Sequence, residues 1–136
     1  MDNASNTMGS TRVLVVDDVI DIVEEMIDML VLADVRAVGA HTIDQAISAL
    51  AAHPSITLVI SDIRLQHESG LDIPDRVAKD PTLATRALRY VFASGDTEGL
   101  ARNPADAGHL LLSKPVSPRL LIATIQRLLE RDGADT

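Results

Sequence analysis

The sequence predicts an α/β fold, a doubly wound five-stranded parallel sheet with helices on both faces. From Arg12 onward, short apolar runs alternate with amphipathic stretches of helical period, the pattern of consecutive βα units. Three of these runs end in charged residues, and ligands of open parallel sheets bind beyond the carboxyl ends of the strands. At 136 residues the chain makes one domain that can bury its own core.

The first half of the chain contains two strand and helix pairs. A strand is expected at Val13–Val16, and a helix follows because apolar residues recur at helical spacing from Ile22 to Leu30 while acids take the other face. A second strand is expected at Val35–Gly39. The pair Thr42 and Gln45 has the spacing of a capping box and starts the second helix, which Pro54 ends.

The third unit begins with the most apolar strand, Leu58–Ser61. We expect a polar loop from there to Gly70 and a helix through Lys79, in which Pro74 is tolerable only near the first turn. Strand four is expected at Leu88–Ala93.

The last unit carries the weakest helical pattern. Thr97 to Asp106 should hold a fourth helix, but glycine and proline leave room for about two turns. Strand five is expected at Leu110–Leu112, and Ser117-Pro118 then supplies an N-cap and first-turn pair for the final helix. The expected boundaries are a flexible leader at residues 1–11, a folded domain at 12–131 and a tail at 132–136.

Composition excludes several classes of function. The absence of cysteine rules out disulfides and thiolate metal sites. The formal charge of −8 disfavours nucleic acid and anionic membranes as partners. No apolar stretch is long enough to span a bilayer and no signal peptide is visible, so a cytoplasmic location is expected.

Charged residues end three of the expected strands. Asp17 and Asp18 follow the first strand, Asp62 ends the third, and Lys114 lies one serine beyond the fifth. Taken singly, Asp17-Asp18 could cap a helix and Lys114 could be a surface lysine. Together they indicate a site for Mg²⁺ and a phosphoryl group, because Mg²⁺ prefers a few hard oxygen ligands.

Chemistry assigns provisional roles to these residues. Asp62 can act as a nucleophile toward phosphorus, and the ammonium of Lys114 can neutralise the transferring group. The hydroxyl of Ser94 can donate to a phosphoryl oxygen, and Gly95 lets the backbone approach closely. A cis bond before Pro115 would aim the lysine inward. The four histidines are expected on the surface or in loops, and Tyr90 and Phe92 in the core.

The order Asp17-Asp18, Asp62, Ser94, Lys114-Pro115 on five βα units resembles the receiver domain of two-component response regulators, from Arg12 to Arg131. The resemblance implies a flavodoxin-like fold with strand order 2-1-3-4-5. It also implies that Asp62 accepts a phosphoryl group from a histidine kinase or a histidine phosphotransfer protein.

The same resemblance implies the ligands of the site. Mg²⁺ (or Mn²⁺) would be held by Asp18, Asp62 and the main-chain carbonyl of Arg64, with Asp17 acting through water. Ser94, Lys114 and the main-chain amides of Ile63 and Gly95 would engage the phosphoryl oxygens.

Three positions depart from the family pattern. Leu111 stands where an aromatic switch residue is usual, and Gln66 where proline is common. The run from Phe92 to Gly95 resembles the single-domain receivers called the FAT GUY group. Arg64 and Asp96 are expected to flank the path of hydrolytic water and to gate it together.

The expected function is a phosphorylation switch that catalyses only its own phosphoryl transfer and dephosphorylation. Its output would be a protein partner bound through helix four, strand five and helix five, with the chain a monomer or a phosphorylation-linked dimer. A phosphate sink or shuttle is the main alternative. A phosphate-independent interaction module would be favoured only by loss of the site. A haloacid-dehalogenase-type phosphohydrolase needs a second aspartate two residues after its nucleophile, where Val19 and Arg64 stand here.

Overall fold

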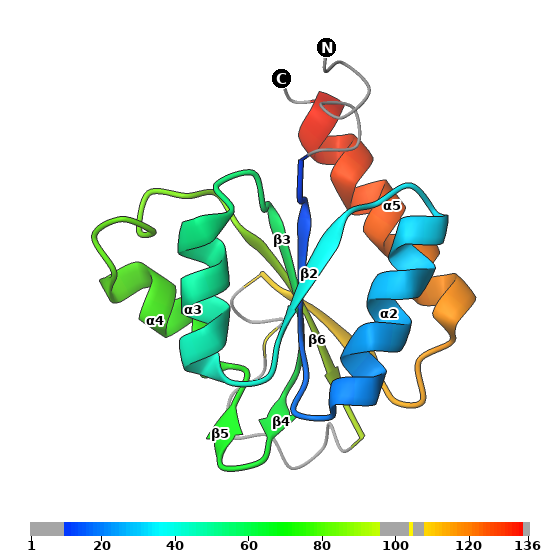
Figure 1. Ribbon diagram of the computed structural model, residues 1–136, viewed down its shortest axis with the longest axis horizontal. Helices are drawn as coiled ribbons and strands as arrows, with labels where there is room; N and C mark the ends of the chain where they lie inside the picture. Colours follow the sequence, from blue (N-terminus) through cyan, green and yellow to red (C-terminus); the bar gives the residue numbers. More distant parts are fainter. Residues whose placement is uncertain (1–9, 96–103, 105–107, 135–136) are drawn as a thin grey trace.

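A single parallel sheet forms the centre of the computed structural model, which describes residues 10–95, 104 and 108–134 (Figure 1). Its strands lie in the order β2-β1-β3-β6-β7, and every neighbouring pair is parallel. This is the predicted order 2-1-3-4-5. The strands are β1 (Val13–Val16), β2 (Ala37–Ala40), β3 (Leu58–Asp62), β6 (Arg89–Ser94) and β7 (Leu110–Ser113).

Helices cover both faces of the sheet. Figure 1 shows α2 (Ile20–Leu32) and α5 (Pro118–Ala134) on one face, and α3 (Ile43–Ala52) and α4 (Asp72–Lys79) on the other. The fourth helix expected from Thr97 to Asp106 falls on residues of which only Pro104, in a 3₁₀ turn, is described. No helix within the described ranges is both long and apolar enough to cross a membrane.

Alternating side chains of the buried strands build a core on each face. Val13 and Val15 of β1 belong to the cluster under α2 and α5, whereas Leu14 and Val16 belong to the cluster under α3 and α4. All four are at most 1% exposed, so the continuous apolar run is explained by burial on both sides. Tyr90 and Phe92 are buried core residues, as predicted.

The second strand begins later than predicted because the end of α2 uses the preceding residues. Asp34 adopts a left-handed φ of 65°, and the Val35 amide donates to the Leu30 carbonyl at 2.8 Å. That bond closes the last turn of the helix. Val35 therefore belongs to the helix end, and β2 starts at Ala37.

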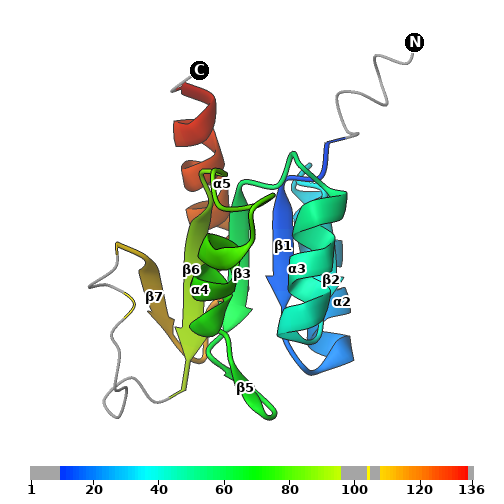
Figure 2. The ribbon, with the colours of Figure 1, turned by 90° about the vertical axis from the view of Figure 1, so that its left-hand side faces the viewer.

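A short hairpin replaces part of the loop expected after the third strand. Its strands, β4 (Arg64–Leu65) and β5 (Glu68–Ser69), pair antiparallel and project beyond the carboxyl edge of the sheet (Figure 2). Sequence reasoning missed it because each strand has two residues. Gln66 in its turn has a φ of 38°, a backbone conformation that residues other than glycine rarely adopt.

The carboxyl end of α3 is held by Arg86. Its guanidinium donates to the carbonyl oxygens of Leu50, His53 and Ile56, with the last two bonds at 3.1 and 2.8 Å. Leu50 lies in the last turn of α3 and His53 is its C-cap, where a helix leaves its last acceptors without intrahelical partners, and Ile56 lies three residues beyond the cap.

Arg86→Ala should lower the free energy of unfolding by about 2–3 kcal/mol, because partly buried carbonyls lose a charged donor. Arg86→Lys should recover only part of this, since an ammonium cannot reproduce the planar fork. Urea unfolding measures both variants. Arg76→Ala is the matched control: it removes an exposed ion pair and should change stability by less than about 1 kcal/mol. Equal effects of Arg86→Ala and Arg76→Ala would contradict the role of Arg86.

Candidate phosphoryl and metal site

The carboxyl ends of three strands bring the predicted charged residues together. Asp17 and Asp18 follow β1, Asp62 ends β3, and Lys114 follows β7. One carboxylate oxygen from each of the three aspartates lies within 4.8 Å of the others. The juxtaposition of these acids with a lysine, expected from strand ends alone, is present.

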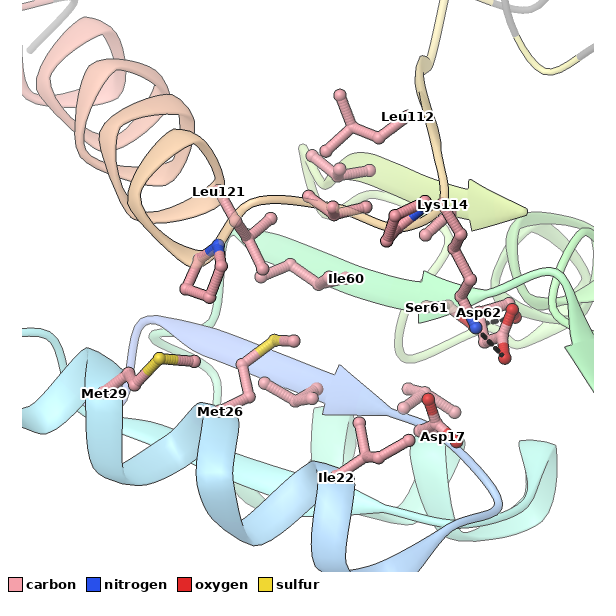
Figure 3. Close-up of a pocket in the computed structure, with 17 residues that line it drawn as sticks. Asp17, Ile22, Met26, Met29, Ile60, Ser61, Asp62, Leu112, Lys114 and Leu121 are labelled. Carbon is pink, nitrogen blue, oxygen red and sulfur yellow. Dashed lines mark hydrogen bonds and ion pairs between the residues drawn. The ribbon is translucent and has the colours of Figure 1, made fainter. Parts of the chain in front are cut away.

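Lys114 joins Asp62 directly. Its Nζ lies 2.8 Å from Oδ2 of Asp62, with side-chain exposures of 39% and 13% respectively (Figure 3). The Lys114 amide donates to the Ser94 carbonyl at 2.8 Å, which continues the pairing of β6 with β7 past its last residues. The bond between Lys114 and Pro115 is cis, as expected.

Asp17 is the most buried acid of the site. It is 7% exposed, and its Oδ1 accepts the Val19 amide at 3.0 Å. Burial raises the pKa of Asp17, and the neighbouring carboxylates of Asp62 and Asp18 raise it further against the opposing effects of that hydrogen bond and of Lys114. Asp17 therefore holds its negative charge at a cost.

The donor set fits a small divalent cation. Three carboxylates face a single ammonium, so negative charge is in excess, and all the side-chain ligands are hard oxygens. Burial is the main cause of the raised pKa of Asp17 and the carboxylates of Asp62 and Asp18 add to it, so a cation beside these acids would relieve an unfavourable charge. Residues Asp17, Asp18 and Asp62 could therefore hold Mg²⁺ or Mn²⁺.

A polar cleft of about 540 Å³ opens over these acids. Besides Asp18, Asp62 and Lys114 it is lined by Arg64, Gln66, Ser94 and Gly95. A Cβ added to Gly95 would meet no atom within 4 Å, so space beside its backbone is open. Asp96, the proposed partner of Arg64 in gating, lies outside the described residues.

One expected phosphoryl donor is already engaged. The Ile63 amide donates to the Ala93 carbonyl at 2.9 Å, extending the pairing of β3 with β6 by one bond. This bond occupies the amide that was expected to face a phosphoryl group, and the role of that amide in phosphoryl binding stays a prediction. The pattern of strand ends did not reveal it, because a ladder can continue past the last apolar residue.

Two further residues support the site without having been predicted. A Cβ on Gly70 would lie 2.3 Å from the main-chain oxygen of Asp62, so only glycine fits there. His41 Nδ1 lies 3.0 Å from the Asp17 carbonyl, a contact in which the ring donates. The sequence showed that Gly70 ends a polar loop, but it could not show that this glycine packs against the main chain of Asp62.

Leu111 stands where receiver domains usually have an aromatic switch residue, and aromatic rings pack together close to it instead. Leu111 is half-buried and packs against the core under α3 and α4. His109, two residues earlier, contacts the rings of Tyr90 and Phe92 edge-on at centroid distances of 4.9 and 5.7 Å. His109 lies in the loop before β7, as expected for a histidine of this chain, but these ring contacts make it a packed residue, and burial lowers its pKa.

An apolar cavity of about 300 Å³ adjoins the site between α2 and α5 (Figure 3). Ile22, Met26 and Met29 line it from α2, and Leu121 from α5. Asp17, Asp62 and Lys114 line its polar end. The charged groups therefore have an apolar wall on one side, which limits their solvation.

Asp17→Asn should stabilise the metal-free protein by about 1 kcal/mol at pH 7, because asparagine can keep the bond to Val19 without the buried charge. The folded pKa lies above the unfolded value of 3.8, so the folded state binds more protons between the two values. Wild-type stability thus falls as pH rises through this window, and the advantage of Asp17→Asn should shrink toward pH 4. Thermal melts with a chelator test this; an advantage independent of pH would contradict it.

Comparison with known protein sequences finds a similar regulatory protein. No protein-family model matches the chain. It is 26% identical over 126 residues to the phosphate regulon transcriptional regulatory protein PhoB of Pseudomonas aeruginosa. The match covers 93% of this chain but 55% of that protein, so the chain spans about half the length of this curated relative.

Solved structures match over nearly their whole length. A receiver domain protein from Clostridium thermocellum superposes with a TM-score of 0.77 at 21% identity, covering 93% of this chain and 99% of that one. A response regulator receiver protein from Pseudomonas putida gives a TM-score of 0.70 at 30% identity, covering 87% and 97% respectively. The chain belongs to the receiver domains of response regulators.

Proposed function

We propose that this protein is a phosphorylation-dependent signalling module in which Asp62 accepts a phosphoryl group from a histidine kinase or a histidine phosphotransfer protein. The observation that carries the proposal is the meeting of Asp62 with one ammonium and two further carboxylates at the edge of the sheet. Family membership supports the same conclusion, since the fold alone would not specify a function.

The chemical step is a nucleophilic displacement at phosphorus. A carboxylate oxygen of Asp62 attacks the phosphorus of the phosphohistidine, a P–O bond forms, and the P–N bond breaks. The imidazole nitrogen leaves with the electron pair and takes a proton. Dephosphorylation is the attack of water on the same phosphorus, which releases inorganic phosphate and returns the carboxylate.

The surrounding residues stabilise the charge of the transferring group. In the unphosphorylated protein the ammonium of Lys114 pairs with Oδ2 of Asp62. After transfer, the same ammonium would contact the phosphoryl oxygens. Ser94 and the amide of Gly95, both lining the polar cleft, donate to the remaining oxygens. A bound Mg²⁺ supplies further neutralisation, and Asp17, Asp18, Asp62 and the carbonyl of Arg64 are the residues that would hold it.

The output that we propose is a conformational switch; a phosphate shuttle, the main alternative, uses the same chemistry. Leu111 cannot act as an aromatic rotor, so Ser94 and Gly95 at the end of β6 would transmit phosphorylation to the segment that follows. The partner surface proposed is formed by β7, α5 and the helix expected from Thr97 to Asp106, of which only Pro104 is among the described residues. The Phe92–Gly95 run supports placement in the FAT GUY group.

Asp62→Asn should abolish incorporation of phosphoryl groups, because an amide oxygen is a poor nucleophile and leaves no acyl phosphate. Wild type incubated with Mg²⁺ and a small phosphodonor should gain one labile phosphoryl group in its intact mass. Asp18→Asn is the companion variant: it keeps the nucleophile and should slow incorporation through weaker metal binding. Unchanged labelling of Asp62→Asn would contradict the assignment.

Arg64→Ala should change the lifetime of the phosphorylated state more than it changes stability. Arg64 is exposed and lines the cleft through which water reaches Asp62. Surface substitutions of this kind alter unfolding free energy by less than about 0.5 kcal/mol. Release of inorganic phosphate from purified phosphoprotein gives the decay rate. Identical rates in wild type and Arg64→Ala would exclude a gating role for this side chain.

A further inference from the structure

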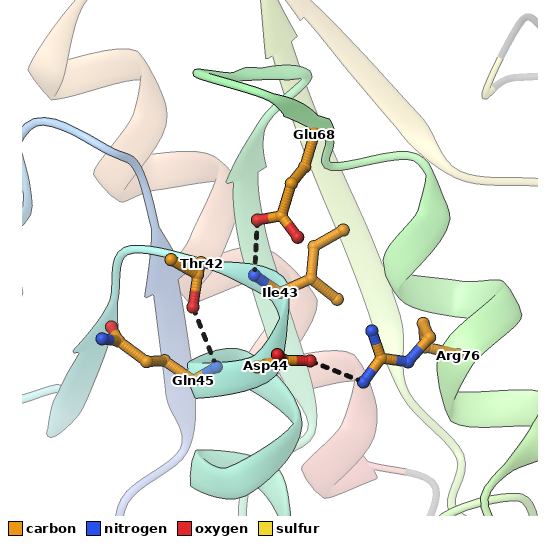
Figure 4. A network of polar contacts seen from close by, with 6 residues as sticks. All are labelled: Thr42, Ile43, Asp44, Gln45, Glu68 and Arg76. Carbon is orange, nitrogen blue, oxygen red and sulfur yellow. Dashed lines mark hydrogen bonds and ion pairs between the residues drawn. The ribbon is translucent and has the colours of Figure 1, made fainter.

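The N-terminus of α3 lies between the two loops that carry the ligands of the proposed metal site. One loop connects β1 to α2 and holds Asp17 and Asp18. The other is the β4–β5 hairpin, which begins at Arg64 directly after the β3 strand. Side chains reach the first turn of α3 from the hairpin and from α4, as Figure 4 shows.

The contact from the hairpin is made by Glu68. Its Oε2 accepts the amide of Ile43, the first residue of α3, at 3.1 Å (Figure 4). This amide has no intrahelical acceptor, and a carboxylate is favoured at the positive end of the helix dipole. Thr42 caps the Gln45 amide at 3.1 Å, so the two acceptors serve different donors of the same turn.

The contact on the other side is made by His41, which precedes the helix cap. Its ring nitrogen Nδ1 bonds the Asp17 carbonyl at 3.0 Å, and its amide donates to Oε1 of Gln45 at 2.8 Å. The first turn of α3 is thereby bonded to the loop of Asp17 through His41 and to the hairpin through Glu68. The two loops share one rigid support.

The hairpin needs such support. Each of its strands has two residues, and isolated two-stranded hairpins are marginally stable in water. Its turn places Gln66 at φ 38°, which adds strain. Leu65, 1% exposed, anchors one strand in the core, and the Gly70 amide anchors the base on the Ile63 carbonyl at 2.7 Å. Glu68 is the anchor on the remaining strand.

We propose that Glu68 is a positioning residue of the metal site: by holding the hairpin against the N-terminus of α3, it fixes the main-chain carbonyl of Arg64 relative to Asp18 and Asp62. This inference rests on the proposed function, because it assumes that a divalent cation binds there. Removing a group that orients a metal ligand typically lowers the affinity for the metal about tenfold or more.

The test is calorimetric titration of Mg²⁺ into wild type, Glu68→Ala, Glu68→Gln and Asp44→Ala at fixed ionic strength. Glu68→Ala should raise the Kd about tenfold. Glu68→Gln should recover most of the affinity, because its amide oxygen can still accept from Ile43. Asp44 is the matched control: it is another acid in the first turn of α3, but it pairs with Arg76 of α4 at 2.9 Å and does not touch the hairpin (Figure 4).

Asp44→Ala should keep the Kd within about twofold of wild type, since an exposed charge is screened by solvent and salt. Melting temperatures without metal should fall for both alanine variants, because each removes an acid from the same helix end. A fall in stability alone therefore cannot mimic the expected change in affinity.

The outcomes separate the two proposals. If wild type binds Mg²⁺ and Glu68→Ala binds it equally well, the positioning role is overturned while the proposed function stands. Equal losses in Glu68→Ala and Glu68→Gln would also overturn it, because the charge and not the hydrogen bond would then matter. Failure of wild type to bind Mg²⁺ would overturn both.

Discussion

The ion pair of Lys114 with Asp62 depends on a property of parallel sheets, which bring the carboxyl ends of all their strands to one edge. Lys114 follows β7 and Asp62 ends β3, and β6 lies between these two strands. No local segment could bring them to 2.8 Å, because 52 positions separate them in the chain. Closing this pair requires β3, β6 and β7 to be assembled in register, so the pair exists only in the folded protein.

The same convergence creates a charge problem that the fold does not relieve by itself. Three carboxylates face one ammonium, and an apolar cavity borders them on the side of α2 and α5. Desolvation is the main reason why the pKa of Asp17 is raised. The fold tolerates this unfavourable concentration of negative charge because burial of the two cores outweighs it. The resulting affinity for cations is what the proposed chemistry would use.

Supports around the edge determine how rigidly the acids are held. Gly70 packs against the main chain of Asp62 where any side chain would collide, and the Ile63 amide extends the β3–β6 ladder past Asp62. On the far side of β6, the rings of Tyr90, Phe92 and His109 pack together, and no aromatic residue stands at Leu111. In the proposed function, a conformational response to phosphorylation of Asp62 would therefore start from the end of β6.

Periodicity and strand-end residues were enough to predict a doubly wound parallel sheet with helices on both faces and to identify Asp17, Asp18, Asp62 and Lys114, because a parallel sheet of βα units places such residues together whatever the details of packing. The strand order came from the resemblance to receiver domains. The sequence alone also determined the Thr42 cap, a local contact. Only the tertiary structure decided where β2 begins, that Arg64–Ser69 forms a hairpin, that the Ile63 amide is occupied, and that His41 and Glu68 meet the two ends of one helical turn. Those contacts join residues far apart in the chain, and no local pattern encodes which partner a polar group will find.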